Sequence, residues 1–352
     1  MKGIILHGGH GTRLRPLTYA RPKQLLPIAN IPMSQYGLES LKEAGISDIA
    51  IIIGGSNSSK VRDYYGDGSK FNVNITYVEQ DEPKGISHAI GLCEEFVDGG
   101  KFVVFLGDNI LVKNINDSTS EFKKSDDAAK ILLCEVSNPK QFGIADLEKD
   151  GSIKRIIEKP KDPPTNLAVI GVYFLTPIIF KVIKNLKPSW RNELEITDAL
   201  QKLLESKKRI SYDIITKYWK DTGTMEDIID ANKTILENMK EYSKINKDGL
   251  KISGKVVIEN NVKIGKKVKL NGPVLIGKDC SIQGNSIVGP NVSIGSGTSL
   301  ENCHIKDSIV MNDCKINLDI KLENSIIPYN TTISSNKEKK SIILCEDSKL
   351  EL

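Results

Sequence analysis

A glycine-rich turn near the N-terminus is the first segment whose residue types could do chemistry. The apolar run Gly3–Leu6 leads into residues 8–13, Gly-Gly-His-Gly-Thr-Arg. Closely spaced glycines let backbone N–H groups turn towards an anion, and Arg13 and Arg15 add fixed positive charge. The segment is not a Walker loop, because no Gly-Lys-Ser/Thr follows, and Leu14 stands where the dinucleotide fingerprint needs its third glycine. The turn predicts a phosphate-binding loop of another kind, with a tight connection as the alternative.

Two aspartates far apart in the chain could hold a metal ion. Asp108 follows the apolar run Phe102–Leu106, and Asp221 lies in a second short segment after Trp219. Ligands of parallel sheets gather at the carboxyl ends of the strands, and carboxylates with waters and substrate oxygens are the usual ligands of Mg²⁺. Taken alone, each aspartate would be a turn or helix-cap residue. Combined with the glycine-rich turn, the pair predicts a magnesium site for phosphate chemistry.

Alternating strands and helices must position these groups. The first two-thirds of the chain alternates short apolar runs with segments of helical spacing. This pattern implies crossover connections and a mostly parallel sheet with helices on both faces, which is a Rossmann-like α/β domain. The predicted strands are Gly3–Leu6, Asp48–Ile53, Ile75–Val78, Phe102–Leu106, Ala129–Val136 and Leu167–Leu175, and the predicted helices are Met33–Glu43, Ser58–Tyr65, Ile86–Phe96, Ile196–Glu205 and Met225–Tyr242.

A six-residue period replaces this pattern after residue 250. Aliphatic residues recur every six positions from Ile252 to Leu300, and a small or branched residue stands two positions before most of them. Each repeat predicts one short strand on one side of a triangular coil, with its aliphatic side chain inside. The register slips after Leu300 and resumes at Val310. The period predicts a parallel β-helix, and an ordinary meander of short strands is the alternative.

Composition narrows the class of protein further. The 49 basic and 45 acidic residues leave a formal charge of +4 over 352 residues, without a long Lys/Arg run that would indicate nucleic-acid binding. No apolar stretch reaches the roughly 18 residues that a membrane span needs. The six cysteines include no Cys-x-x-Cys pair, which argues against a zinc site or a disulfide framework. We therefore expect a cytoplasmic protein with neither nucleic acid nor a membrane as partner.

Eight separated segments resemble the motifs of the sugar-phosphate nucleotidyltransferases. The turn at 8–18 and the run Arg-Pro-Lys-Gln-Leu-Leu-Pro at 21–27 resemble the opening of that family. Together with the β-helix, the run Arg-Asn-Glu-Leu-Glu-Ile-Thr-Asp at 191–198 resembles the long form of the glucose-1-phosphate thymidylyltransferases, which implies a left-handed coil. The other matching segments are 80–89 for the base, 106–109 for the metal, 158–160 and 166–169 for the sugar, and 219–224.

The resemblance implies a Mg²⁺-dependent reaction that joins glucose 1-phosphate to dTTP and releases pyrophosphate. Such a site needs cations and preorganised donors more than acid–base groups. The implied catalytic residues are Arg13 at the triphosphate, Lys23 at the α-phosphate, and Asp108 and Asp221 at the metal. The implied nucleotide-binding residues are Leu6, Gly8, Gly11, Thr12, Arg13, Gln24, Gln80 and Gly85, and the implied sugar-phosphate-binding residues are Asn109, Gly143, Glu158, Lys159, Val169 and Arg191.

Some of these residue types suit their implied roles. Gln80 can both donate to and accept from a pyrimidine edge, and Gly85 offers backbone where a side chain would block the base. Glu158 is suited to bind a pair of sugar hydroxyls. Two positions depart from the family pattern: Ile31 replaces a lysine, and Asn192 replaces the glycine that follows Arg191. His7, His10 and His88 have no metal-ligand partners in sequence, and none of these three is expected to be catalytic.

The domain organisation follows from the motifs and the repeat. We expect a nucleotidyltransferase domain at 1–243, a β-helix at 250–335 and a tail at 336–352, with Ser243–Gly249 as the linker and Ile342–Leu344 capping the last coil. All reaction motifs precede residue 230, so the β-helix is expected to supply assembly and stability. Related β-helices associate around threefold axes, which implies a homo-oligomer and favours a trimer.

Three other functions are left open by the residues. The same chemistry could use UTP or another sugar 1-phosphate, because thymine and uracil differ by one methyl group. The β-helix could carry acetyltransferase activity with His304 as its base, as in related bifunctional proteins. A non-catalytic, regulatory member of the fold is the third alternative. The presence of Arg13, Lys23, Asp108 and Asp221 together argues against it, because a binding module needs no pair of metal carboxylates.

Overall fold

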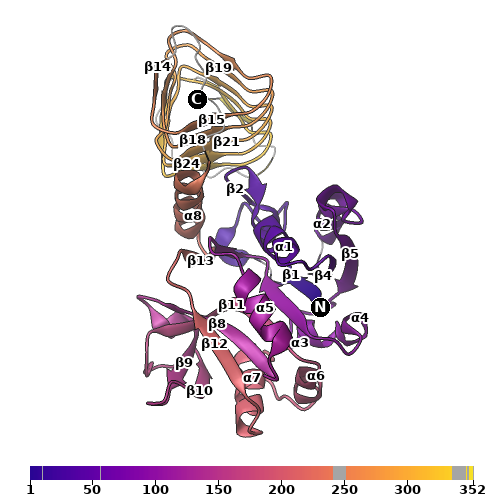
Figure 1. The fold of residues 1–352 in the computed structure, drawn as a ribbon. Coiled ribbons are helices and arrows are strands. Elements are labelled where there is room, and N and C mark those ends of the chain that lie inside the picture. Colours follow the sequence, from indigo (N-terminus) through magenta and orange to yellow (C-terminus); the bar gives the residue numbers. More distant parts are fainter. Residues whose placement is uncertain (10, 56, 241–250, 335–345, 347–348, 352) are drawn as a thin grey trace. The chain divides into compact units, whose positions relative to one another are not determined.

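The computed structural model describes residues 1–9, 11–55, 57–240, 251–334, 346 and 349–351 (Figure 1). These residues form two compact units. The first consists of Met1–His10 and Ser34–Asp221, and the second of Gly11–Met33 and Thr222–Leu352. The predicted linker Ser243–Gly249 and the predicted cap Ile342–Leu344 lie outside the described residues, as do the predicted domain boundaries near 243 and 250.

The first unit is built on a nine-stranded sheet in the order β10-β9-β11-β6-β1-β4-β5, with β8 beside β11 and β12 beside β8. Its strands are β1 (Lys2–Leu6), β4 (Asp48–Ile53), β5 (Asn74–Glu79), β6 (Phe102–Leu106), β8 (Ala129–Glu135), β9 (Gly143–Leu147), β10 (Ile153–Glu158), β11 (Leu167–Leu175) and β12 (Ile210–Ile214). A separate ribbon pairs β7 (Asn109–Leu111) with β13 (Trp219–Asp221). The helices are α1 (Met33–Glu43), α2 (Ser58–Tyr65), α3 (Ile86–Gly91), α4 (Glu94–Val97), α5 (Asn116–Lys124), α6 (Ile178–Ile183) and α7 (Ile196–Glu205).

The sheet is parallel in its first half and mixed in its second. β1 runs parallel to β4 and β6, and β4 runs parallel to β5, as the strand–helix alternation predicts. β11 instead runs antiparallel to β6, β8 and β9. The reason is that β9, β10 and β11 follow one another without crossover helices, and strands joined directly by loops pair antiparallel.

Helices cover both faces of this sheet, as predicted. Ile4 and Val104 share one buried cluster with Ile90 of α3, Phe180 of α6 and Leu200 of α7. The next residue of β6, Phe105, points to the opposite face, because side chains alternate along a strand. There α1 packs so closely that a Cβ on Gly37 would lie 2.8 Å from the Phe105 ring. The strand ends between these two helical layers position the candidate site.

The helix predictions need correction at one predicted helix, and they missed another. The predicted helix Ile86–Phe96 is interrupted: α3 ends at Gly91 and α4 begins at Glu94. Gly91 is a poor helix former, and Leu92 is 41% exposed instead of continuing an apolar stripe. The sequence also gave no sign of α5, since Phe122 is its one large buried apolar side chain among polar residues. A helix with one large buried apolar side chain has no apolar stripe, so the spacing of apolar residues does not indicate it.

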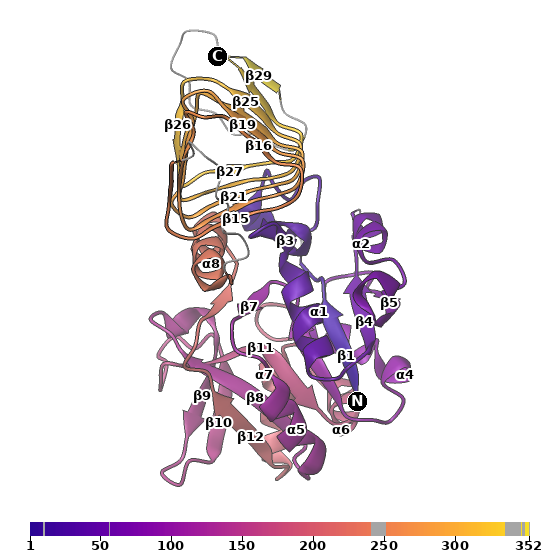
Figure 2. The same ribbon diagram turned by 45° about the horizontal axis from the view of Figure 1, so that its top comes forward.

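The second unit contains a left-handed parallel β-helix whose coils form three sheets, seen almost end-on in Figure 2. Each of five successive coils contributes one strand to each sheet, and the third sheet has one further strand. The first sheet consists of β14 (Lys251–Ser253), β17 (Lys269–Asn271), β20 (Ile287–Val288), β23 (His304–Lys306) and β26 (Lys321–Glu323). The second consists of β15 (Val256–Ile258), β18 (Val274–Ile276), β21 (Val292–Ile294), β24 (Ser308–Val310) and β27 (Ile326–Ile327), and the third of β16 (Lys263–Ile264), β19 (Ser281–Gln283), β22 (Ser299–Glu301), β25 (Lys315–Asn317), β28 (Thr332–Ser334) and β29 (Lys349–Glu351).

From Ile258 onward, the aliphatic residues of the six-residue period pack into one ladder inside the coil, as predicted, whereas Ile252 in the first strand is 36% exposed. Leu270 pairs with Val288, and Val288 pairs with Ile305, one residue short of a full eighteen-residue coil. The register slip seen in the sequence is therefore a shortened corner. The corner residues on either side of β23, Asn302 and Asp307, both adopt positive φ, a left-handed conformation that Asn and Asp tolerate. Shortening the corners keeps the inward ladder intact.

Helix α8 (Met225–Asn238) covers the outer face of the second sheet (Figure 1). This face carries apolar side chains such as Leu275, which is buried with Leu236 of α8 and with Ala29. The buried Asn232 joins three segments, because its Oδ1 accepts hydrogen bonds from the Ala29 backbone N–H (2.8 Å) and the Ser293 hydroxyl (2.9 Å). The N-terminal segment 11–33 thus belongs structurally to the β-helix.

Replacing Asn232 should test how much this junction contributes to stability. Asn232→Leu leaves the Ala29 N–H and the Ser293 hydroxyl buried without their acceptor, and we expect a loss of about 2–4 kcal/mol in the free energy of unfolding. Asn238→Leu, on the exposed last turn of the same helix, is the matched control and should change it by less than about 0.5 kcal/mol. Equal effects of the two substitutions in denaturant titrations would contradict this role of Asn232.

Candidate active site

The first unit brings the two predicted metal carboxylates together. Asp108 stands between β6 and β7, and β13 pairs antiparallel with β7 so that Asp221 lies opposite Asn109. The turn before Asp108 is fixed to β1, because the Gly107 N–H donates to the Leu6 carbonyl at 3.0 Å. Asp108 and Asp221 are each partly exposed as residues, although Asp221 Oδ1 is itself buried. Two neighbouring carboxylates form a donor set that fits Mg²⁺.

Asn109 holds this arrangement in place. Its side chain is 3% exposed, and its Nδ2 donates to Asp108 Oδ1 at 2.9 Å. Its Oδ1 accepts from Trp219 Nε1 at 2.7 Å and from the Gly171 backbone N–H at 3.2 Å. Gly171 must be glycine here, since a Cβ would lie 2.6 Å from Asn109 Oδ1. The resemblance assigns Asn109 to the sugar phosphate, and the structure also makes it the residue that orients Asp108.

A small cavity of about 60 Å³ lies beside the glycine-rich turn in the same unit. Gln80 is buried in its wall with its Nε2 2.9 Å from His88 Nδ1, so His88 orients the predicted base-binding amide. Gly8 leaves space there, because even a Cβ would remain 3.9 Å from Gln80 Oε1. Burial lowers the pKa of His7 to about 3, although the charge of Asp108 opposes the shift. The cavity is lined by His7, Gly8, Gly9, Gly54, Gly55, Gln80, Asp81 and Pro83.

Gly85 connects the base segment to the sugar segment. Its φ is +104°, and a Cβ would lie 2.6 Å from the Leu194 carbonyl oxygen. The backbone around it is fixed by two hydrogen bonds, from the Leu194 N–H to the Lys84 carbonyl (2.7 Å) and from the Ser87 N–H to the Leu194 carbonyl (3.0 Å). The structure thus gives a reason for glycine beyond the one that the sequence suggested, namely the close approach of the Leu194 backbone.

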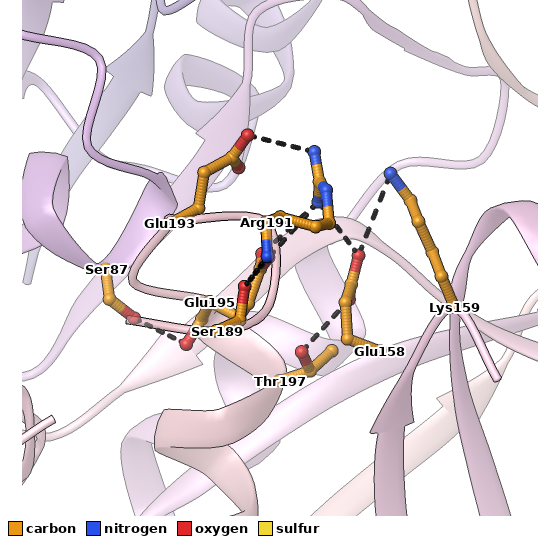
Figure 3. Close-up of polar contacts among 8 residues, drawn as sticks. All are labelled: Ser87, Glu158, Lys159, Ser189, Arg191, Glu193, Glu195 and Thr197. Carbon is orange, nitrogen blue, oxygen red and sulfur yellow. Dashed lines mark hydrogen bonds and ion pairs between the residues drawn. The ribbon is translucent and has the colours of Figure 1, made fainter. Parts of the chain in front are cut away.

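A cluster of charged side chains around Arg191 forms the predicted sugar-phosphate site (Figure 3). Arg191 Nη1 lies 3.4 Å from Glu158 Oε1 and 3.2 Å from Glu195 Oε1. Thr197 donates to the second oxygen of Glu158 at 3.0 Å, and Ser189 donates to Glu195 at 2.9 Å. These contacts draw β10, α7 and the loop before α7 into one site.

Three carboxylates share one guanidinium in this cluster. Glu193 is the third partner of Arg191, at 3.0 Å from Nη2. Lys159 is less engaged, with its Nζ 3.9 Å from Glu158 Oε1. Lys159 is therefore the cation most available to a phosphate. To bind a phosphate, Arg191 would have to release one of its carboxylate partners. The side chain of Glu193 is 34% exposed and that of Glu195 is 4% exposed, so Glu193 is the partner that can be replaced.

Left-handed backbone conformations at Lys159 and at Asn192, next to Arg191, help to position the Lys159 and Arg191 side chains. Asn192 adopts φ of +61°, the left-handed region that favours glycine, so this replacement keeps the turn that a glycine would make. Lys159 has φ of +41°, and its N–H donates to the Phe142 carbonyl at 3.0 Å. The neighbouring Gly143 has no room for a side chain, because a Cβ would clash with the Thr197 methyl and lie 3.2 Å from Glu158 Oε2. Val169 is buried in β11 next to this region of the sheet.

The charges of the cluster act on Glu158. Burial raises the pKa of Glu158 above its ordinary value, and the neighbouring Glu195 carboxylate raises it further. The Thr197 hydrogen bond and the positive charges of Lys159 and Arg191 oppose the rise without cancelling it. The folded protein therefore holds a carboxylate that is less stable in its charged form than in water, as functional sites commonly do.

The second unit carries the remaining predicted residues. Gly11 (φ +57°) precedes the 3₁₀ turn Thr12–Leu14, which exposes Thr12 and Arg13. The Arg13 guanidinium lies against Gly223, where a Cβ would come within 3.1 Å of it. Lys23 and Gln24 are buried and open the 3₁₀ turn Lys23–Leu25, and a Cβ on Gly11 would lie 3.3 Å from Lys23 Cβ. The unit therefore groups Gly11 with Lys23, and Arg13 with Gly223.

Two further positions from the sequence have clear places in this unit. Ile31, which replaces a family lysine, is in the two-residue strand β3 (Ile31–Pro32) and is 38% exposed. His304 lies in β23 between Ile287 of β20 and Lys321 of β26 in the first sheet. The adjacent Ile305 points into the coil, so His304 points to its outer face.

The fold and the site define an α/β nucleotidyltransferase with a β-helix extension. The chain belongs to the nucleotidyl transferase family, whose model matches residues 2–238, and the model of the GMPPB C-terminal domain matches residues 270–351. It is 45% identical to the low-salt glycan biosynthesis nucleotidyltransferase Agl11 of Haloferax volcanii over the full length of both chains. It is 44% identical to the glucose-1-phosphate thymidylyltransferase of Streptomyces antibioticus, over 68% of this chain and 67% of that one.

Solved structures agree with this assignment. A candidate glucose-1-phosphate thymidylyltransferase from Bacillus anthracis, crystallised with a sucrose, superposes with a TM-score of 0.64 at 40% identity and covers 69% of this chain and 98% of its own. A UDP-glucose pyrophosphorylase in complex with UDP-glucose superposes with a TM-score of 0.60 at 31% identity, over 68% of this chain and 99% of its own. No helix among the described residues is long and apolar enough to cross a membrane.

The raised pKa of Glu158 leads to a prediction about pH. Folding raises the pKa of this carboxyl group above its ordinary value of 4.5, so the folded state binds the proton more tightly than the unfolded state. The free energy of unfolding therefore falls as the pH rises from 4.5 through the raised pKa. Glu158→Gln should therefore be as stable as the native chain or more stable at pH 8, with the difference vanishing near pH 4. If Glu158 accepts sugar hydroxyls as the resemblance implies, the KM for sugar phosphate should rise about tenfold, equivalent to about 1.4 kcal/mol.

Thermal unfolding at several pH values and steady-state kinetics measure the two effects separately. Glu205→Gln, on the exposed end of α7, is the matched control and should leave the KM unchanged. A lower melting temperature of Glu158→Gln at pH 8, or an unchanged KM, would contradict the role of Glu158 as a strained binding carboxylate.

Proposed function

We propose that this chain is a sugar-1-phosphate nucleotidyltransferase that joins glucose 1-phosphate to dTTP and forms dTDP-glucose and pyrophosphate. The observation that carries the proposal is the pairing of β13 with β7, which places Asp221 opposite Asn109 and beside Asp108. In the same unit, Lys159, Arg191 and Glu158 form a site of the polarity that a sugar phosphate needs. Similarity to named glucose-1-phosphate thymidylyltransferases supports the choice of substrates.

The proposed reaction is an in-line displacement at phosphorus. A phosphate oxygen of the sugar phosphate attacks the α-phosphorus of the triphosphate, and the bond between the α-phosphorus and the bridging oxygen to the β-phosphorus breaks as pyrophosphate leaves. No net proton transfer to a side chain is required, so positioning and charge stabilisation supply most of the catalysis. Lys159 and Arg191 are proposed to orient the attacking phosphate. Arg13 and Lys23 keep the roles at the triphosphate that the resemblance implies.

Mg²⁺ is proposed to be held by Asp108 and Asp221. Bound there, the ion would neutralise phosphate oxygens and orient the triphosphate. The hydrogen bond from Asn109 Nδ2 to Asp108 Oδ1 orients the carboxylate that is proposed to bind the ion. Trp219 and Gly171, which fix the Asn109 amide, are then positioning residues of the metal site.

UTP is the second candidate nucleotide, because the chain also superposes on a UDP-glucose pyrophosphorylase. Gln80 can hydrogen-bond the edge of either pyrimidine, so it does not discriminate between them. The single methyl group of thymine is worth only about 1–3 kcal/mol in an apolar pocket. We therefore expect measurable activity with UTP and a higher kcat/KM with dTTP.

Product analysis with each triphosphate paired with each sugar 1-phosphate tests the proposal. Purified protein is incubated with dTTP, UTP, CTP, ATP or GTP and with glucose, N-acetylglucosamine or mannose 1-phosphate, and products are identified by mass spectrometry. We expect the highest kcat/KM for dTTP with glucose 1-phosphate. A higher value for a purine nucleotide or for another sugar phosphate would overturn the substrate assignment while leaving the reaction class intact.

Substitution of the two aspartates tests the metal assignment. Asp108→Asn and Asp221→Asn should each reduce turnover about 100-fold or more, since each removes a charge that the reaction relies on. Each should also weaken binding of Mn²⁺, used as a spectroscopic probe for Mg²⁺, in titrations without substrates. Asp63→Asn is the control, because Asp63 is exposed on α2 and lies outside every segment that matches the family. Normal turnover and Mn²⁺ affinity in a folded Asp108→Asn would contradict the assignment.

A further inference from the structure

We propose that the end of the β-helix positions Lys23 for the reaction, through a clamp made by Arg21, Tyr329 and Glu346. This inference rests on the proposed function, in which Lys23 acts at the triphosphate. By sequence, the β-helix carries no reaction motif. Through the clamp, the C-terminal region would affect turnover by fixing the position of Lys23, although it contains no reaction motif.

The contacts of Arg21 define the clamp. Its Nη2 lies 2.7 Å and its Nε 3.1 Å from Glu346 Oε1, and its guanidinium carbon lies 4.0 Å from the centre of the Tyr329 ring. The Glu346 side chain is only 9% exposed and that of Arg21 is 26% exposed. An ion pair with so little access to water is screened less than a surface pair, and stacking on an aromatic ring fixes the plane of the guanidinium.

The clamp is connected to Lys23 through a short, stiff segment. Pro22 separates Arg21 from Lys23, and its ring fixes φ at −59°. The Pro22 carbonyl accepts from the Leu25 N–H at 3.0 Å, which closes the 3₁₀ turn that Lys23 opens. Any shift of the Arg21 backbone is therefore passed to Lys23 instead of being absorbed by the chain between them.

The other end of the segment is also fixed to the β-helix. The Ala29 N–H donates to Asn232 Oδ1 of α8 at 2.8 Å, and Asn30 Nδ2 donates to the Ile294 carbonyl of β21 at 2.8 Å. Lys23 thus lies between two attachments to the C-terminal region, which are far apart along the β-helix sequence. The anchor at Ala29 and Asn30 sets where the segment ends, and the clamp sets where it begins.

The test compares two ion pairs of the second unit in the full-length protein. Glu346→Gln breaks the clamp, and Glu323→Gln breaks the exposed pair between Lys306 and Glu323 (2.6 Å) as a matched control. We expect Glu346→Gln to lower kcat about tenfold, equivalent to about 1.4 kcal/mol. The KM for the sugar phosphate should change less than twofold, and Glu323→Gln should leave both constants unchanged.

A double-mutant cycle separates positioning of Lys23 from a general loss of stability. In a Lys23→Met background, Glu346→Gln should cause no further loss of kcat, because its effect passes through the missing ammonium group. If the tenfold loss persists in that background, or if Glu323→Gln causes the same loss, the clamp does not act through Lys23 and the proposal is overturned.

Amide hydrogen exchange supplies a readout that does not depend on activity. Exchange at the Leu25 and Leu26 amides should accelerate in Glu346→Gln and not in Glu323→Gln, and unchanged exchange would overturn the proposal. If the native chain catalyses no nucleotidyl transfer with any substrate pair, the proposed function fails. In that case the exchange experiment still decides whether the clamp holds the segment.

Discussion

The amide of Asn109 is the contact on which the catalytic half of the structure depends. It lies where β7, β11 and β13 meet, and it accepts from two of these strands while donating to Asp108. Asp108 and Asp221 are more than one hundred residues apart in sequence, and the ribbon of β7 and β13 is only three residues long on each side. So short a ribbon is not stable by itself. Burial of the Asn109 amide supplies the specific contacts that hold the two carboxylates at the same end of it.

The sugar-phosphate cluster shows how a binding site stores unfavourable charge. Arg191 is shared among Glu158, Glu193 and Glu195, and two of these carboxylates are largely buried. Packing like charges together costs stability, which the raised pKa of Glu158 records. In the proposed function, a sugar phosphate would offer new partners to Lys159 and Glu158. Its binding would then relieve part of this cost to the stability of the fold.

The β-helix performs two separate tasks with the two sides of its strands. Inward residues such as Val288 and Ile305 form a continuous ladder, which stabilises the coil from coil to coil. Outward residues of one sheet, such as Leu275, are buried under α8 and Ala29. This second surface is what attaches the N-terminal segment 11–33, and with it Arg13 and Lys23, to the C-terminal region. The contacts therefore group residues 11–33 with the C-terminal region, whereas the sequence motifs group them with the rest of the nucleotidyltransferase domain.

Local patterns in the sequence determined the strands of the parallel half-sheet, helices such as α1 and α7, and the β-helix with its register slip. These features depend on periodicities of 2, 3.6 and 6 residues, which are visible within a short window. The motifs also predicted which residues would bind phosphate and metal. The tertiary structure alone decided the pairing of β13 with β7, the sharing of Arg191 among three carboxylates, and the attachment of Arg21 to Tyr329 and Glu346. The β13–β7 pairing and the contacts of Arg21 join residues that are distant in sequence. The sharing of Arg191 depends on which of several nearby carboxylates the fold brings closest. A local sequence pattern contains neither kind of information.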